Sequence, residues 1–151
     1  MAEVTINKMM KLSEHFTLAE LCKTSAKTAD GNIPSHVHIE NLKNLCENWL
    51  EPLRQRYNKP ILINSGFRSE AVNKAIGGVK GSNHLTGCAV DIRVTGLEQA
   101  IRYACILLDI SEESKRDYDE LLIERSPKGT YWLHFAVRPK DNRRKVRFIQ
   151  T

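Results

Sequence analysis

The chain has 151 residues, of which 41% are hydrophobic, so it can bury a substantial core as one domain without disulfides or a structural metal. Its formal net charge of +5 is compatible with nucleic acid, anionic glycopolymers or acidic cell-wall peptides as partners. The basic residues form no aromatic-interleaved platform, which argues against nucleic acid, and no run of about 18 apolar residues marks a membrane span.

The N-terminal segment is predicted to be a tail over residues 1–12, followed by a single domain over residues 13–151. The tail has neither a sustained apolar stretch nor a small-residue cleavage site, so we expect no signal peptide and synthesis in the cytoplasm. The four cysteines are widely spaced, without any Cys-x-x-Cys pair, which argues against a zinc knuckle or a thioredoxin-like motif.

Two helices are predicted in the first third of the chain. Thr17 followed by Glu20 forms a capping-box pattern, so a short helix should begin near Leu18. After a polar loop over residues 24–32, apolar residues at three- and four-residue spacing predict an amphipathic helix over residues 35–57. Pro52 predicts a kink or an early stop in that helix.

The middle of the chain combines a short strand, a helix and a glycine-rich loop. Residues 61–65 form a compact β-type run, and residues 69–76 are predicted to be helical. The glycine-rich residues 77–82 then lead to His84. They lack the Gly-Lys-Ser/Thr order of a phosphate-binding loop.

Most strands of the sheet are predicted in the second half of the sequence. Residues 89–94 alternate, which places Asp91 on the face opposite Val90 and Ile92 and away from the apolar core. A helix over residues 97–108 precedes two strands, 120–125 and 131–137, joined by a hairpin loop, and residues 145–149 add an edge strand. We therefore predict an α+β fold in which a small central antiparallel sheet carries the metal site and packs against two or three helices.

Three side chains form a candidate metal site. His84 and Asp91 lie seven positions apart around Gly87, and His134 lies in a later strand. Two imidazoles and one carboxylate are the three protein ligands of a catalytic zinc site, whose fourth position stays open for water. The other histidines lack such surroundings and are predicted to have surface or capping roles. The pattern predicts a zinc hydrolase.

At these residues the sequence resembles the zinc D-alanyl-D-alanine metallopeptidases, a family of D,D-carboxypeptidases, dipeptidases and phage endolysin peptidases with hedgehog signalling domains as structural relatives. The family signature Ser-x-His-x-x-Gly-x-Ala-x-Asp matches residues 82–91 at every specified position, and a Trp-x-His strand follows at residues 132–134. Residues 65–69 look like the family's Ser-Gly-Tyr/Phe-Arg segment. The resemblance extends from about residue 16 to residue 137 and is greatest to the small prophage branch.

The resemblance implies that Zn²⁺ is bound by His84, Asp91 and His134. It further implies that Arg68 holds the substrate's terminal carboxylate or polarises the scissile carbonyl, as its planar guanidinium allows; the alternative is a surface salt bridge. Ser82 is predicted to contact the substrate backbone or to support the ligand loop. Trp132 is also assigned to substrate binding.

The general base is the position at which the sequence departs from the family. Many relatives carry an acidic residue three positions before the last histidine ligand, but this chain has Tyr131 there. Residues 119–124 resemble the Asp-Gln-Leu-Ile-x-Glu strand of the prophage branch, so Glu124 is predicted to be the base. The alternative is that Glu124 is a solvent-exposed charged residue on a strand, without a catalytic role. Glu120 is the weaker candidate, because it lies farther from the hairpin.

These expectations describe a zinc metallopeptidase that hydrolyses peptidoglycan stem or cross-bridge peptides, as a D,D-carboxypeptidase or an endopeptidase. The resemblance implies a prophage endolysin that degrades the cell wall after phage-type release, acts as a monomer on peptidoglycan or muropeptides, and has no nucleic-acid or membrane partner. Two alternatives remain open: a non-catalytic cell-wall-binding module that retains the metal site, and a nucleic-acid-binding domain favoured by charge alone.

Overall fold

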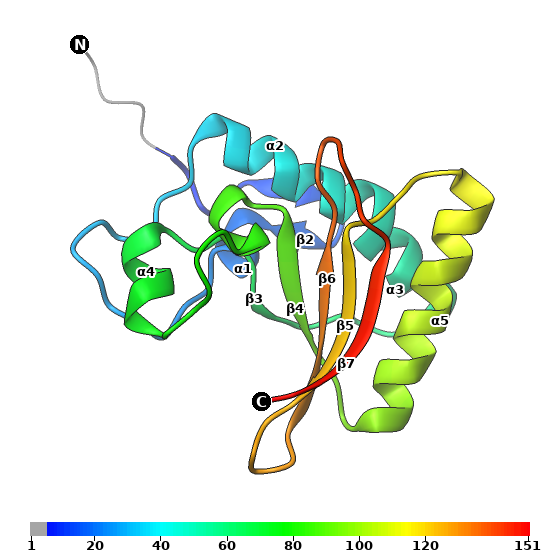
Figure 1. The fold of residues 1–151 in the computed structure, drawn as a ribbon. Coiled ribbons are helices and arrows are strands. Elements are labelled where there is room, and N and C mark those ends of the chain that lie inside the picture. Colours follow the sequence, from blue (N-terminus) through cyan, green and yellow to red (C-terminus); the bar gives the residue numbers. More distant parts are fainter. Residues whose placement is uncertain (1–5) are drawn as a thin grey trace.

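The computed structural model describes residues 6–151, so residues 1–5 of the predicted tail lie outside the described part. Figure 1 shows a central sheet, with the helical segment of residues 36–57 behind it and the long helix of residues 97–114 at its right. The α+β prediction is confirmed. Residues 11 and 12 of the predicted tail belong to the first strand, and Leu12 is buried in the core.

Within residues 6–151 the helical elements are five α-helices, one π-helical turn and one 3-10 turn. In chain order they are α1 (Leu18–Leu21), α2 (His36–Leu45), η1 (Cys46–Leu50, π), α3 (Glu51–Tyr57), α4 (Glu70–Ala75), η2 (Asn83–Thr86, 3-10) and α5 (Leu97–Ser114). None of the helices within residues 6–151 is both long and apolar enough to cross a bilayer.

The strands of the described part of the chain form a two-stranded and a five-stranded sheet. They are β1 (Lys11–Ser13), β2 (Phe16–Thr17), β3 (Ile63–Ser65), β4 (Ala89–Arg93), β5 (Glu120–Arg125), β6 (Tyr131–Ala136) and β7 (Lys145–Gln150). The larger sheet has the order β3-β4-β6-β5-β7.

The larger sheet is mixed, so the prediction of an antiparallel sheet is wrong for one strand. β7 pairs with β5 in parallel, while the other pairs are antiparallel. The reason is connectivity: β6 ends beside the start of β5, and residues 137–144 lead the chain directly into β7 at that same end of the sheet. Because β7 then lies on the outer side of β5, it runs in the same direction as β5.

Helix ends follow the capping chemistry expected from the sequence. The Thr17 hydroxyl accepts a hydrogen bond from the Glu20 backbone, as predicted, and Ser35 and His38 form a second capping box at the start of α2. The predicted helix over residues 35–57 is present but contains η1. Pro52 has no N–H to donate to the carbonyl four residues earlier, and the preceding turn widens so that the Glu51 N–H bonds to Cys46.

The two faces of the larger sheet have different roles. One face packs against α2, η1, α3 and α5; there Trp49 of η1 contacts Phe135 of β6, with ring centroids 5.0 Å apart. α5 continues six residues beyond its predicted end because Ile110 and Ser111 are also buried. Strand alternation turns the intervening side chains, among them Asp91 and His134, to the opposite face. That opposite face carries the candidate site.

Candidate metal centre

The first histidine is presented by η2, a single turn that needs glycine at its end. The Ser82 hydroxyl accepts a hydrogen bond of 3.2 Å from the His84 backbone N–H and caps the turn. Gly87 then adopts a φ of +75°, and a Cβ at this position would lie 2.5 Å from the His38 carbonyl oxygen of α2. Glycine is therefore required both for the left-handed conformation and for the close packing of η2 on α2. Ser82 thus contacts the loop that presents His84, and its predicted contact with the substrate backbone stays a prediction.

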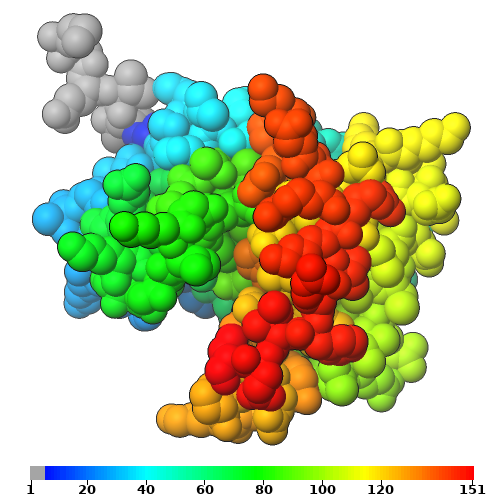
Figure 2. All heavy atoms as spheres, viewed as in Figure 1, coloured from blue at the N-terminus to red at the C-terminus, as the bar shows by residue number. Residues whose placement is uncertain are grey.

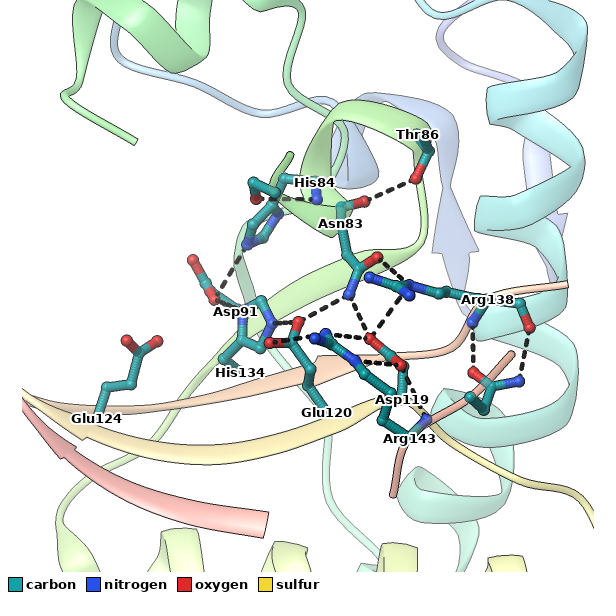
Figure 3. Close-up of polar contacts among 12 residues, drawn as sticks. Asn83, His84, Thr86, Asp91, Asp119, Glu120, Glu124, His134, Arg138 and Arg143 are labelled. Carbon is teal, nitrogen blue, oxygen red and sulfur yellow. Dashed lines mark hydrogen bonds and ion pairs between the residues drawn. The ribbon is translucent and has the colours of Figure 1, made fainter. Parts of the chain in front are cut away.

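The three predicted ligands converge on one point. Pairing of β4 with β6 sets Asp91 opposite His134, and all three side chains are buried. The Asp91 Oδ1 atom lies 3.3 Å from His84 Nε2 and 3.1 Å from His134 Nδ1 (Figure 3). One ligand atom from each residue lies within 4.8 Å of the others, as a shared metal ion requires.

The second nitrogen of each imidazole has a partner of its own. His84 Nδ1 lies 2.7 Å from the Gly66 carbonyl oxygen, which can only accept, and His134 Nε2 lies 3.0 Å from Glu120 Oε1. These contacts leave His84 Nε2 and His134 Nδ1 directed toward Asp91. Such outer partners orient metal-binding histidines, and the resulting set of two nitrogens and one oxygen suits a transition metal better than calcium or magnesium.

The electrostatics of the cluster follow from this pairing. Burial raises the pKa of Asp91, but the neighbouring His84 and His134 outweigh it and hold that pKa far below its ordinary value. Burial lowers the pKa of His134, but hydrogen bonds to Asp91 and Glu120 outweigh it and raise the pKa to about 9. Without metal, the cluster is therefore an ionised carboxylate beside a protonated imidazole.

Arg68 joins this cluster and does not form a surface salt bridge. Its Nη2 lies 3.0 Å from Asp91 Oδ2, its Nε donates to the Ser65 hydroxyl at 3.0 Å, and its side chain is only 14% exposed. The guanidinium lines the same cleft as the three ligands. It neutralises the carboxylate oxygen of Asp91 that does not face the histidines.

The two candidate bases have different surroundings. The register of β5 and β6 places Leu122 opposite His134, so Glu120 and Glu124 flank that histidine on the same face. Glu120 contacts the His134 ring, whereas Glu124 Oε2 accepts a hydrogen bond of 2.8 Å from Trp132 Nε1. Burial raises the pKa of Glu124, and the hydrogen bond from Trp132 offsets only part of that rise. Trp132, predicted to bind substrate, thus supports Glu124.

A buried polar network beside the ligands was not predicted from the sequence. Its centre is Asp119, whose side chain is fully buried and accepts from Asn83 Nδ2 at 2.8 Å and from Arg143 Nε and Nη2 at 3.0 and 2.8 Å. Arg138 Nε lies 3.2 Å from the same carboxylate. Burial raises the pKa of Asp119, but these donors outweigh it and lower the pKa to about 2. The sequence offered one signal of this network: Asp119 is an acidic residue directly before the predicted strand 120–125, which pairs with the strand that carries His134.

The three predicted ligands line a cleft of about 700 Å³. The glycine-rich residues 77–81 line it on one side, and Arg143 and Lys145 line it from the C-terminal segment. Figure 2 views these segments, with the glycine-rich segment in green and the C-terminal strand in red. Ser82, Glu124 and Trp132 also line this cleft, so every predicted site residue borders it.

The geometry agrees with a comparison of the sequence with known families. A family model described as Peptidase M15 matches residues 14–115, which is more than half of the chain and includes Arg68, His84 and Asp91. The chain belongs to the peptidase M15 family. The family resemblance seen in the sequence is confirmed, although β5, β6 and β7, and with them His134 and both glutamates, lie beyond the matched residues.

A carboxypeptidase is also similar in sequence to this chain. The zinc D-Ala-D-Ala carboxypeptidase of Streptomyces albus G is 32% identical over 96 residues, which cover 58% of this chain. The aligned region spans only 37% of that carboxypeptidase. The similarity thus concerns little more than a third of the relative's length.

Proposed function

We propose that this member of the peptidase M15 family is a zinc-dependent peptidase that hydrolyses peptide bonds of the D-Ala-D-Ala type in peptidoglycan stem or cross-bridge peptides. The observation that carries the proposal is the convergence of His84 Nε2, Asp91 Oδ1 and His134 Nδ1, with the second nitrogen of each imidazole held by an outer partner. The similarity to a zinc D-Ala-D-Ala carboxypeptidase supports the choice of metal and substrate.

The donor set fits zinc, which favours imidazole nitrogen and carboxylate oxygen in a four-coordinate site. When bound, zinc supplies a Lewis acid that polarises a carbonyl and lowers the pKa of water. The protein would hold that ion with three rigid ligands on η2, β4 and β6 and leave its remaining position facing the cleft.

The other side chains have roles that follow from their positions. Glu124 is the proposed base: it is half-buried, burial raises its pKa and so makes its carboxylate a stronger proton acceptor than an exposed glutamate, and Trp132 fixes its carboxylate. Arg68 is proposed to bind the substrate's terminal carboxylate or to stabilise negative charge on the scissile carbonyl oxygen. Its charge beside Asp91 and its place in the cleft support either role.

The finer biological assignment is also a proposal. We propose that the protein acts as a monomer on peptidoglycan or muropeptides, as a prophage-type endolysin that reaches the wall after phage-type release. The net charge of +5 would favour approach to an anionic wall. A carboxypeptidase releases a terminal residue and an endopeptidase cleaves within a cross-bridge, so the peptide products distinguish the two activities.

The test combines defined muropeptides with a variant of the base. Glu124→Gln keeps the acceptor for Trp132 but cannot take a proton, so we expect kcat to fall by roughly 10²- to 10⁴-fold while zinc stays bound stoichiometrically. Product masses would distinguish release of a terminal residue from cleavage within a cross-bridge. Glu112→Gln, an exposed change on α5, is the matched control and should retain activity.

Two outcomes would contradict the proposal. Full turnover by Glu124→Gln with metal bound would refute the assignment of the base. If zinc-loaded wild-type protein released no new amine ends from any muropeptide but bound peptidoglycan, it would be a non-catalytic cell-wall-binding module, an alternative that the missing acid at Tyr131 keeps open.

A further inference from the structure

We propose that Glu120 is a positioning residue for His134, fixing which ring nitrogen faces the metal, and that buried Asp119 holds this support in place. The inference rests on the proposed function and deepens it. The residues concerned are here called the Asp119 network; they are Asn83, Asp119, Glu120, Arg138 and Arg143, all drawn in Figure 3.

His134 has two ring nitrogens that can carry its proton. A neutral imidazole carries one N–H, and the nitrogen without it is the one that binds a metal. Glu120 Oε1 lies 3.0 Å from Nε2 and stabilises the proton there, so that Nδ1, which faces Asp91, is the nitrogen that would lose its proton to bind the metal. His84 is arranged the other way round, with its Nδ1 toward the Gly66 carbonyl and its Nε2 toward Asp91. The two histidines therefore present different nitrogens to one metal.

The other contacts of Glu120 show that its carboxylate is poorly placed to act as the base. Its Oε1 atom also accepts a hydrogen bond of 2.7 Å from Asn83 Nδ2, and its Oε2 lies 3.6 Å from Arg143 Nη2. It contacts the ring nitrogen that points away from Asp91, so the imidazole lies between Glu120 and the ligand atoms. A carboxylate held by cationic and amide donors behind a ligand is placed to orient that ligand and is poorly placed to take a proton from water.

Asn83 links Glu120 to Asp119. The Asn83 amide donates to both carboxylates, while its Oδ1 accepts from Arg138 Nε at 2.9 Å, which fixes the direction of the amide. Asn83 is the residue before His84 in η2. Asp119 thus anchors the loop of one histidine ligand and the support of the other, and Arg138 and Arg143 balance its buried charge.

Glu120→Gln separates a positioning role from a base. Glutamine keeps an oxygen that can accept from both His134 and Asn83, because both donors meet the same atom, Oε1. We expect Glu120→Gln to retain zinc affinity and kcat within a few-fold of wild type, and Glu120→Ala to lose roughly 10- to 100-fold in zinc affinity. The matched variant Glu124→Gln should show the reverse pattern, with zinc retained and turnover lost.

Imidazole ¹⁵N NMR of the zinc-loaded protein gives a readout that needs no substrate. We expect His134 to carry its proton on Nε2 and to bind through Nδ1 in wild type and in Glu120→Gln, with a mixture of tautomers in Glu120→Ala. Metal binding by His134 through Nε2 in wild type would overturn the proposal. So would a loss of turnover in Glu120→Gln as large as that in Glu124→Gln with zinc still bound.

The contribution of Asp119 is tested by Asp119→Asn, with zinc affinity measured under conditions where circular dichroism shows the variant folded. We expect a weaker zinc site and the appearance of the second His134 tautomer. A folded variant with unchanged zinc affinity and tautomer would restrict Asp119 to fold stability and overturn that half of the proposal. If wild-type protein bound zinc as described but cleaved no peptide, the proposed function would fail while the positioning of His134 stood.

Discussion

At the scale of single residues, Glu120 and Glu124 show what a strand pattern can and cannot predict. Alternation places both on the face of His134, and the hairpin register sets Leu122 opposite His134, so the two glutamates are equally displaced along β5. Which one contacts the ring is decided by hydrogen-bond donors from elsewhere. Trp132 is the hairpin partner of Glu124, whereas Asn83 comes from η2 and only the folded chain brings it to Glu120.

Trp132→Phe tests the environment of Glu124. The indole N–H stabilises the ionised carboxylate, so its removal should raise the pKa of Glu124 further above its ordinary value. If Glu124 is the base, the acidic limb of the profile of kcat/KM against pH should move to higher pH, because a higher pH is then needed to ionise it. The measurement is that profile, recorded on one muropeptide with saturating zinc.

Tyr131→Phe is the control for that experiment, since it alters a neighbouring aromatic residue of the same strand whose cross-strand partner is Arg125 and not Glu124. An unmoved acidic limb in Trp132→Phe would indicate that another group sets the pH dependence.

The affinity for zinc should depend on pH through His134. In the metal-free protein its raised pKa keeps the ring protonated at neutral pH, while Asp91 remains ionised because its pKa is depressed. Zinc must displace the His134 proton, so its affinity should fall by up to about tenfold for each unit of pH decrease below the pKa of His134. Competition with a chelator over a range of pH measures this dependence, and a pH-independent affinity near neutrality would contradict it.

At the scale of elements, local chemistry made much of the fold predictable. The capping residues Thr17 and Ser35 begin helices, and the loop over residues 126–130 closes the hairpin as expected. The π-helical turn and the parallel placement of β7 depend on events that no window of sequence shows. The first needs the surrounding helix to continue past Pro52, and the second needs β7 to reach the outer side of β5.

Gly87 offers a test of how η2 is seated on α2. Gly87→Ala should destabilise the fold by about 2–4 kcal/mol, because the new Cβ would combine a positive φ with a clash against the His38 carbonyl. Gly77→Ala is the matched control: its φ of +72° is similar, but no atom lies within 4 Å of the new Cβ. The control should therefore lose only about 1 kcal/mol.

Urea unfolding of the metal-free proteins measures both values, and zinc affinity shows whether His84 has moved. Equal losses of stability in the two glycine variants would mean that the contact with α2 does not constrain the ligand loop.

At the scale of the whole molecule, the site joins parts of the chain that are far apart in sequence. Asp91 and His134 are 43 residues apart, and Asn83 and Arg138 are 55 residues apart. The ligand set was predictable because it follows a motif. The Asp119 network was not, since its arginines come from a segment whose position depends on the fold of the entire sheet.

Asp119 should also govern stability in acid. Its folded pKa of about 2 lies below the ordinary value of 3.8, so its carboxylate contributes stability at neutral pH that is lost as the pH falls from about 4 to 2. Asp119→Asn should be less stable than wild type by about 2 kcal/mol at pH 7, and the difference should shrink across that acidic window. Chemical unfolding at several pH values gives the comparison. A constant difference down to pH 2 would contradict this assignment.

The position of Arg143 after the last ligand strand makes the final segment part of the metal site. A protein shortened to end at Val137 would still contain His84, Asp91 and His134, yet Asp119 would lose both guanidinium partners inside the core. Such a fragment would satisfy every family motif in its sequence and still lack the two cations that balance the Asp119 carboxylate next to its ligands. The motif alone therefore does not define the smallest catalytic unit. A shortened protein should also keep the residues that pair with Asp119, through at least Arg143.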